Sequence, residues 1–344
     1  ESVASLGEKT LPTQMTRVTV LVAVYNTENY LRRCLDSLLS QTMAGWQAEC
    51  VDDGSTDGSA AILDDYAAKD SRIRVTHLTQ NSGQAHARNV GLKRAEGDVV
   101  AFLDSDDWLS DDALESVVDV FDAHPLTGCV LFHCVNHYPD HDEPYPMADF
   151  SVMSGKEAFL KSLTWSIHGV YAVRRSIHQR YPYDETLRAY GDDNVTRLHY
   201  LSSAEVRLAT GVYFYRQHAS SVTHRISVRR FDYLEANIIM KRELERIGAD
   251  RDVIAVYENC RWRNVIGLCM FYYLHHRELP KDDARHGLLT IRRAWQSIDV
   301  AMLDGRSACH RFGFWPLRFS WPLFRLQERI YFFLRGLVGK NTES

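Results

Sequence analysis

The sequence predicts an α/β fold built on a parallel sheet, and three observations support this prediction. Short apolar, β-branched runs alternate with amphipathic stretches through the first 124 residues. Each apolar run ends directly in polar or acidic residues. The composition, 45% hydrophobic and 25% charged, is typical of a folded globular protein and excludes a disordered chain.

The first strand–helix pair is predicted at 16–24 and 30–41. The run TRVTVLVAV carries no charge after Arg17, which suits a strand buried on both faces of a parallel sheet. The polar Tyr25-Asn26-Thr27-Glu28 interrupts it, and leucines at helical spacing follow. The chain therefore begins with strand, loop and helix.

Two further pairs follow. A short strand at 48–51 is ended by Asp52-Asp53-Gly54-Ser55, and a helix is expected at 60–68. Residues 72–78 alternate like a strand, and a polar loop from Thr79 leads into a helix at 85–95.

The fourth pair consists of a strand at 98–103, DVVAFL, and a helix at 111–124 with an acidic first turn. Between them stands Asp104-Ser105-Asp106-Asp107. Ligands of such sheets bind at the carboxyl ends of the strands. We therefore expect the loops that carry Asn26, Asp53 and Asp106 to meet at one edge of the sheet.

The second half of the chain is irregular from residue 150 and then helical. Short strands are predicted near 169–173 and 206–216. Helices are predicted at 231–247, 252–276 and 282–295. The resulting division is an N-terminal extension at 1–15, a catalytic domain at 16–228, and a C-terminal helical region with a basic aromatic tail at 229–344.

Charge and cysteine content restrict the partners and the cellular compartment that we expect for this protein. The net charge is -5, yet residues 305–340 hold seven Lys/Arg and one acid, so an acidic body carries a basic tail and nucleic acid is not an expected partner of the body. The seven cysteines form no CxxC pair, which predicts reduced core residues. With no apolar run of about 18 residues and no signal-peptide pattern, we expect a cytoplasmic protein.

The acidic loop at 104–107 has the residue types of a divalent-metal site. Hard cations such as Mg²⁺ or Mn²⁺ take carboxylate oxygens, and a departing diphosphate needs such a cation. Acids two residues apart at a strand end can both approach one ion, and without a cation they would repel one another. The alternative is an acidic helix start, which is the better interpretation of Asp111 and Asp112.

Three segments together resemble the inverting family 2 glycosyltransferases of the GT-A fold, of the type that serves bacterial polysaccharide biosynthesis. They are VAVYNTENYLRRCLDSLLSQT, VDDGSTDGS and NSGQAHARNVGLKRAEGDVVAFLDSDD, and the similarity extends over about 17–225. It implies a GT-A nucleotide-diphospho-sugar transferase fold, a Rossmann-like mixed sheet flanked by helices, here with a C-terminal helical extension.

The resemblance also implies a nucleotide-sugar site. Asp53 takes the position that accepts the imide N–H of uracil, and Tyr25 the position that stacks on the base, which favours a UDP donor. Arg88 contacts the diphosphate, holds the acidic loop, or forms a structural ion pair. Ala23 replaces the usual proline or threonine. The implied nucleotide-sugar residues are Ala23, Tyr25, Asn26, Glu28, Asp53, Gly83, Arg88, Asp104 and Ser105.

Metal ligands and a base are implied in the same way. Asp106 matches the direct metal ligand, Asp104 the ribose or the metal's water shell, and His218 an imidazole that some relatives place on the metal. Asp193 falls on the position of the base that deprotonates the acceptor hydroxyl, with Asp192 in place of the usual glutamate. The alternative for the Asp192-Asp193 pair is a helix N-terminal doublet.

The tail at 306–340 has two interpretations. Arginines spaced between bulky aromatics suit an anionic membrane surface, which would place the protein on the inner face of the plasma membrane. Alternatively the aromatics pack on the catalytic domain or on a second subunit, giving a homodimer. Pro316 and Pro322 exclude one continuous helix before Leu323.

The resemblance predicts a transferase that moves a sugar from a UDP-sugar to a hydroxyl of a glycan or lipid-linked glycan, with Mn²⁺ or Mg²⁺ as cofactor. The alternative is an inactive nucleotide- or glycan-binding module, which would have lost a metal or base residue. A dinucleotide-dependent dehydrogenase is disfavoured because no GxGxxG follows the first strand. The donor sugar and the acceptor are not specified by these motifs.

Overall fold

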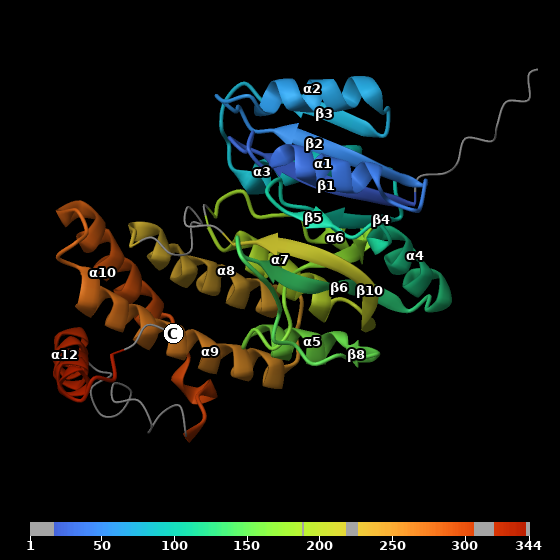
Figure 1. The fold of residues 1–344 in the computed structure, drawn as a ribbon. Coiled ribbons are helices and arrows are strands. Elements are labelled where there is room, and N and C mark those ends of the chain that lie inside the picture. Colours follow the sequence, from blue (N-terminus) through green and yellow to red (C-terminus); the bar gives the residue numbers. More distant parts are fainter. Residues whose placement is uncertain (1–16, 188, 218–225, 306–319, 342–344) are drawn as a thin grey trace, which may run out of the picture. The chain divides into compact units, whose positions relative to one another are not determined.

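The computed structural model describes residues 17–187, 189–217, 226–305 and 320–341 (Figure 1). The chain divides into two compact units, each made of several segments. The first ends at residue 135 and adds 170–180 and 207–215, while the second contains 136–169, 181–206 and the chain from 216 onward. Each unit has its own hydrophobic core. The linear division at residue 228 stays a prediction about domains.

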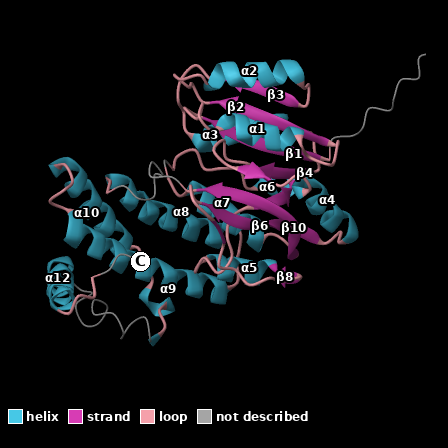
Figure 2. Cartoon of the chain, viewed as in Figure 1, coloured by secondary structure: helices cyan, strands magenta, loops and turns pink. Residues whose placement is uncertain are grey.

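The first unit contains the predicted α/β sheet (Figure 2). Its strands are β1 (Val18–Val24), β2 (Trp46–Asp52), β3 (Ile73–His77), β4 (Val99–Phe102), β5 (Trp108–Leu109), β6 (Thr127–His137), β9 (Tyr171–Arg174) and β10 (Glu205–Arg216). The strand order is β3-β2-β1-β4-β9-β6-β10-β5. β1 is parallel to β2 and β4, β2 is parallel to β3, and β9 is antiparallel to β4 and β6. The sheet is therefore mixed, as predicted.

Helices cover both faces of this sheet. They are α1 (Leu31–Leu39), α2 (Ser59–Lys69), α3 (Gln84–Arg94), α4 (Ala113–Ala123) and α6 (Arg175–Arg180). Val18, Val20 and Val22 share one core with α1, α2 and α4. Leu21 points to the opposite face, where a Cβ on Gly91 of α3 would lie 3.2 Å from its side chain. The charge-free strand at the N-terminus is thus buried on both faces, as the sequence predicts.

Some elements of the first unit lie where none is predicted. β5 has two residues and α6 has six, which is too short for a periodic pattern. β6 is longer, with its first six positions all buried. A continuous apolar run of that kind has no alternation, so periodicity does not distinguish a strand from a buried helix.

The second unit is mainly helical. Its elements are β7 (Asp142–Pro144), β8 (Val152–Ser154), α5 (Gly155–Ser162), α7 (Gly191–Leu201), the 3-10 turns η2 (Val228–Phe231) and η3 (Val300–Met302), α8 (Asp232–Arg246), α9 (Arg251–His275), α10 (Lys281–Gln296) and α12 (Trp321–Leu337). The predicted helices at 231–247, 252–276 and 282–295 are confirmed as α8, α9 and α10. α12 begins two residues before Leu323 because proline is tolerated in the first helical turn.

Aromatic packing and one buried ion cluster hold these helices together. Trp262 of α9 and Phe324 of α12 lie in the same core, with ring centroids 6.0 Å apart. The buried Glu258 carboxylate contacts Lys241 of α8 at 3.2 Å and Arg261 at 2.5 Å. The cluster links α8 to α9, and removal of either partner of a buried pair would leave an uncompensated buried charge.

Glu328 of α12 is a buried acid without such a partner. It is 3% exposed, and neither carboxyl oxygen has a hydrogen-bond partner among the described residues. Burial raises the pKa of Glu328 from 4.5 to about 8. As the pH rises from 4.5 toward about 8, Glu328 ionises in the unfolded chain before it ionises in the folded protein. The free energy of unfolding therefore falls over that interval.

We expect Glu328→Met to stabilise the protein, by about 1–3 kcal/mol at pH 8, because it removes an unpaired buried carboxyl group. The gain should shrink at pH 4, below the unfolded pKa of 4.5, where the wild-type side chain is mostly protonated in both states. Urea denaturation at the two pH values measures it. The matched control is Glu245→Met on the exposed surface of α8, and equal pH dependence of the wild type and the Glu328 variant would contradict the prediction.

Two further sequence predictions concern cysteines and membrane spans. Cys34, Cys50, Cys129, Cys134 and Cys260 are buried and carry free thiols, as predicted, and Cys269 is free and partly buried. Cys309 lies outside the described residues. Among the described helices, none combines the length and the apolar character that crossing a bilayer requires.

Candidate active site

The loops that follow β1 and β2 are joined by hydrogen bonds. The Asn26 N–H donates to the Ser55 hydroxyl at 3.1 Å, and the Thr56 N–H donates to Asn26 Oδ1 at 2.8 Å. The Gly58 N–H donates to Glu28 Oε2 at 2.6 Å. The side chains of Asn26 and Glu28, predicted in the nucleotide site, therefore fix the neighbouring loop in this structure.

The two other residues predicted from this region lie beside that junction. Ala23 is partly buried on β1, opposite Val51 of β2. Tyr25 is 46% exposed at the end of β1. An exposed ring at a strand end is free to stack on a planar ligand.

Asp53 organises the start of α3. Its carboxylate is 2% exposed and accepts the backbone N–H groups of Ser82 and Gly83, both at 2.8 Å. Gly83 has a φ of 95°, which a side chain would strain, although a Cβ there would meet no atom within 4 Å. Each carboxylate oxygen keeps a second lone pair, so Asp53 can still accept an imide N–H.

The acidic loop is anchored by α3. Arg88, which is 7% exposed, donates from Nη2 to Asp104 Oδ1 at 2.5 Å, and Gln84 donates to the same oxygen at 3.0 Å. This contact fits two of the alternatives for Arg88, the one in which it holds the acidic loop and the one in which it forms a structural ion pair, and contact with a diphosphate stays a prediction. The Asp104 side chain remains 34% exposed.

Tyr213 of β10 also contacts the acidic loop. The Asp104 N–H donates to the Tyr213 hydroxyl at 3.1 Å, and that hydroxyl donates to Asp107 Oδ2 at 2.8 Å. Tyr213 and Asp107 are buried, as is Ser105 between the two predicted metal ligands. The tyrosine hydroxyl thus links the backbone of one acid to the side chain of another.

We expect Tyr213→Phe to destabilise the protein by about 1–3 kcal/mol, because it leaves the buried Asp107 carboxylate without this donor. Affinity for Mn²⁺ should fall as well, since the Asp104 backbone loses its acceptor. Chemical denaturation and Mn²⁺ titration measure the two effects. Tyr215→Phe, two residues along the same strand and 37% exposed, is the matched control. Unchanged stability of Tyr213→Phe would contradict the assignment.

The acidic loop fits a hard divalent cation. Asp104 and Asp106 offer carboxylate oxygens, the ligand class of Mg²⁺ and Mn²⁺. The loop creates a negative field around Tyr215. Burial of the Tyr215 hydroxyl raises its pKa to about 12, and the negative charges of Asp107, Asp104 and Asp106 contribute to this rise. Within the described residues no cluster of three or more His, Cys, Asp or Glu side chains is placed to hold a metal. His218 lies outside the described residues.

Asp193 lies in the second unit, in the first turn of α7. The preceding Tyr190 has a φ of 61°, and the exposed Asp192 is also in this first turn. The Arg197 guanidinium lies 3.5 Å from Asp193 Oδ2, and the Asp193 side chain is 13% exposed. Burial raises the pKa of Asp193 to about 7, Arg197 opposes the rise and Asp192 adds to it. A carboxylate with this pKa is suited to accept a proton near neutral pH.

Sequence reasoning missed Gln84, Tyr213 and Arg197. Arg197 is four residues after Asp193 on one helix, and that spacing could have indicated the ion pair. Gln84 is in the NSGQAHARNVG segment but carries no distinguishing signal. Tyr213 contacts a residue 106 positions away, which no local pattern reveals.

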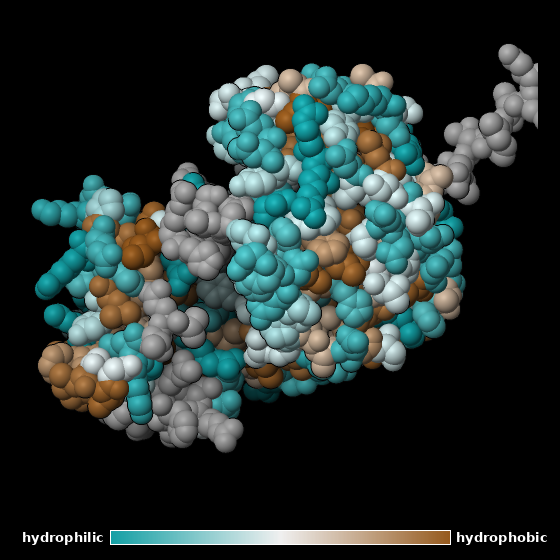
Figure 3. Space-filling view, viewed as in Figure 1, coloured by the Kyte–Doolittle hydropathy of each residue, from teal (hydrophilic) through white to brown (hydrophobic). Residues whose placement is uncertain are grey.

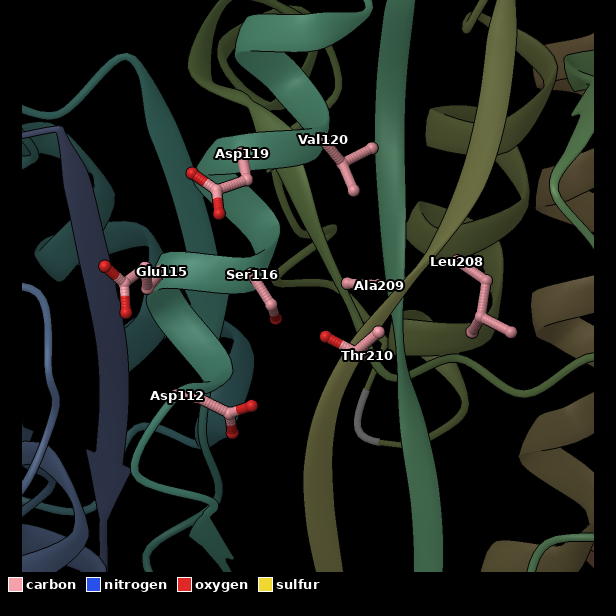
Figure 4. Close-up of a pocket in the computed structure, with 8 residues that line it drawn as sticks. All are labelled: Asp112, Glu115, Ser116, Asp119, Val120, Leu208, Ala209 and Thr210. Carbon is pink, nitrogen blue, oxygen red and sulfur yellow. The ribbon is translucent and has the colours of Figure 1, made fainter.

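A separate pocket of about 350 Å³ lies in the first unit between α4 and β10 (Figure 4). Glu115 accepts the Thr42 hydroxyl at 2.5 Å, and Asp112 accepts the Ser110 hydroxyl at 2.6 Å. Figure 4 shows the acids on α4 and Leu208, Ala209 and Thr210 on β10. None of its lining residues belongs to the predicted site, so the pocket is not assigned to it.

Fold and site together define a class of protein. A mixed sheet with acidic loops at the carboxyl edge of its parallel strands is the GT-A fold of nucleotide-sugar glycosyltransferases, as predicted. Residues 19–181 match the model of Glycosyl transferase family 2. This segment, just under half of the chain, is similar to that family.

Known proteins with similar sequence and structure agree with this placement. EpsH of Bacillus subtilis (strain 168), whose name assigns it to the glycosyltransferases, is 33% identical over 228 residues, which are 62% of this chain and 65% of EpsH. The chain thus spans just under two thirds of that relative.

Two solved structures share the fold. TarS of S. aureus in complex with UDP-GlcNAc aligns with a TM-score of 0.71 and 19% identity, covering 94% of this chain and 92% of that one. The mannosyltransferase PcManGT of Pyrobaculum calidifontis, in complex with GDP-Man and Mn²⁺, aligns with a TM-score of 0.51 and 19% identity, covering 96% and 89%. Proteins of this fold therefore bind different nucleotide sugars.

Proposed function

We propose that this protein is an inverting glycosyltransferase that moves a sugar from a UDP-sugar to a hydroxyl of a glycan or lipid-linked glycan. The observation that carries the proposal is the meeting of three loops at one edge of the sheet. β2, β1 and β4 are adjacent and parallel, and the polar residues that end them lie in one hydrogen-bonded region with α3. This is the edge where α/β sheets bind nucleotides.

In the proposed reaction the acceptor oxygen attacks the anomeric carbon from the face opposite the diphosphate. The new C–O bond forms as the bond to the diphosphate oxygen breaks, and UDP departs with the bonding electrons. Asp193 accepts the proton of the acceptor hydroxyl. Asp104 and Asp106 would hold a divalent ion, which neutralises charge on the departing diphosphate. Arg88 and Gln84 keep the Asp104 carboxylate oriented.

The residues proposed to recognise the nucleotide lie at the same edge of the sheet. The exposed Tyr25 offers its ring to the base, and Asp53 offers a carboxylate that suits an imide N–H. Uracil presents that N–H between two carbonyl groups. The complex of TarS with UDP-GlcNAc supports a uridine donor for this fold, while that of PcManGT with GDP-Man makes the guanosine donors the necessary comparison.

The experiment is a panel of UDP-, GDP- and dTDP-sugars with Mn²⁺ or Mg²⁺, scored for nucleotide release with and without a chelator. Release from a UDP-sugar that stops when the chelator is added supports the proposal. Indifference to the chelator, or preference for a purine nucleotide, contradicts it. Nucleotide binding without turnover, with all donors and with glycan acceptors present, would favour the inactive module instead.

A further inference from the structure

α12 of the second unit has two apolar faces, of which one is covered. Phe324 and Phe332 are buried in the core with Trp262 of α9. Part of the aromatic tail therefore packs on protein, as one of its two interpretations predicts. The residues on the other face of the helix are not used in this packing.

The second face of α12 is exposed and continuous. Its members recur at steps of three and four residues, which places them on one side of a helix. Each is between 48% and 69% exposed. They are Leu323, Leu326, Ile330, Phe333, Leu334 and Leu337. In Figure 3, hydrophobic residues gather over the helix that Figure 1 labels α12. Isolated exposed leucines are ordinary, but a contiguous face of six marks an interaction surface.

The charge beside this face is basic. Arg325 and Arg329 lie along its edge, on the side between the buried and the exposed residues. The one acid of α12, Glu328, is buried on the opposite face. Burial also keeps its carboxyl group protonated near neutral pH, because its pKa is about 8. The exposed part of α12 therefore combines apolar side chains with positive charge.

We propose that this exposed face of α12 binds the protein to an anionic lipid surface. The leucines and Phe333 enter the acyl boundary, and Arg325 and Arg329 extend to lipid phosphates. With 17 residues, α12 would lie in the membrane plane, since no described helix is suited to cross a bilayer. A second copy of α12 fits less well, because pairing two such faces would bring their arginines together with no exposed acid on either helix.

Flotation of the full chain with vesicles tests the proposal without any substrate. We expect the protein to float with phosphatidylglycerol-containing vesicles, to float less at high salt, and to stay in solution with pure phosphatidylcholine. Leu326→Gln/Ile330→Gln/Phe333→Gln should abolish flotation. Arg325→Gln/Arg329→Gln should weaken it on the order of tenfold, since two cations leave the anionic surface.

The matched control replaces three exposed apolar residues outside α12: Leu126→Gln/Val256→Gln/Leu289→Gln. It should float like the wild type. Circular dichroism confirms that all variants are folded, and UDP release from a donor in detergent-free buffer should be equal in all of them. This readout separates a failure of membrane binding from a failure of the proposed activity.

Two outcomes overturn the proposal. One is flotation of the α12 triple variant equal to that of the wild type. The other is absence of wild-type flotation together with a dimer, seen by analytical ultracentrifugation, that the triple variant loses. That second result would identify another copy of this chain as the occupant of the face.

Discussion

Asp193→Asn should lower kcat on the order of 10²–10⁴-fold and leave the KM for the sugar donor nearly unchanged, because the variant loses only the group that accepts the acceptor proton. The amide has nearly the same shape and cannot act as a base. Steady-state kinetics with donor and acceptor varied separately measure the effect. An equal loss in donor affinity would instead indicate that Asp193 serves the nucleotide site.

The pH dependence provides a second measurement of Asp193. Its pKa of about 7 means that the active, ionised form is lost as the pH falls below that value. We therefore expect kcat/KM to fall about tenfold per pH unit below pH 7 and to be level above it. A profile that is flat between pH 5 and pH 8 would contradict the assignment.

Asp192→Asn is the matched control for the neighbouring acid. It makes the same chemical change one residue earlier, at an exposed position. Asp192 contributes to the raised pKa of Asp193. We expect this variant to keep most of the maximal rate and to move the acidic limb to lower pH, because one repelling charge is gone. Loss of the maximal rate equal to that of Asp193→Asn would show that Asp192 acts directly.

The strands that carry the site could be predicted because their signal is local. A run such as Val18–Val24 has no charge, and a strand without charge belongs inside a parallel sheet. The polar residues that stop each strand then predict the edge of the sheet at which Asp53 and the acidic loop lie. The helices α8, α9 and α10 followed from equally local periodicity.

What the sequence did not reveal depends on contacts between distant segments. Nothing in Tyr213 itself indicates that its hydroxyl links Asp104 to Asp107, because both acids lie in a loop more than 100 residues earlier in the chain. Asn26 and Glu28 illustrate a second limit of local patterns. Their position in a family motif predicts nucleotide contact, which stays a prediction, and the motif does not reveal that their oxygens accept backbone N–H groups of the next loop. A motif thus locates a site without separating residues that touch the ligand from residues that shape the loop.

The second large effect is expected at the acidic loop. Asp106→Asn should reduce turnover on the order of 10²–10³-fold, since one carboxylate ligand of the divalent ion becomes a neutral amide. The same variant should bind UDP weakly and equally well with or without Mn²⁺, whereas Mn²⁺ should strengthen UDP binding to the wild type. Isothermal titration calorimetry of UDP in the presence of Mn²⁺ and of a chelator measures both.

Asp111→Asn separates this effect from a general loss of negative charge. Asp111 is exposed and lies five residues further along the chain. Its replacement by asparagine removes the same unit of negative charge. Its effect on turnover should be below about twofold, because an exposed charge is screened by salt and water. If both variants reduce the Mn²⁺ dependence equally, the field of the whole acidic segment attracts the ion. If only Asp106→Asn does so, Asp106 is a direct ligand, as its position in the acidic loop leads us to expect.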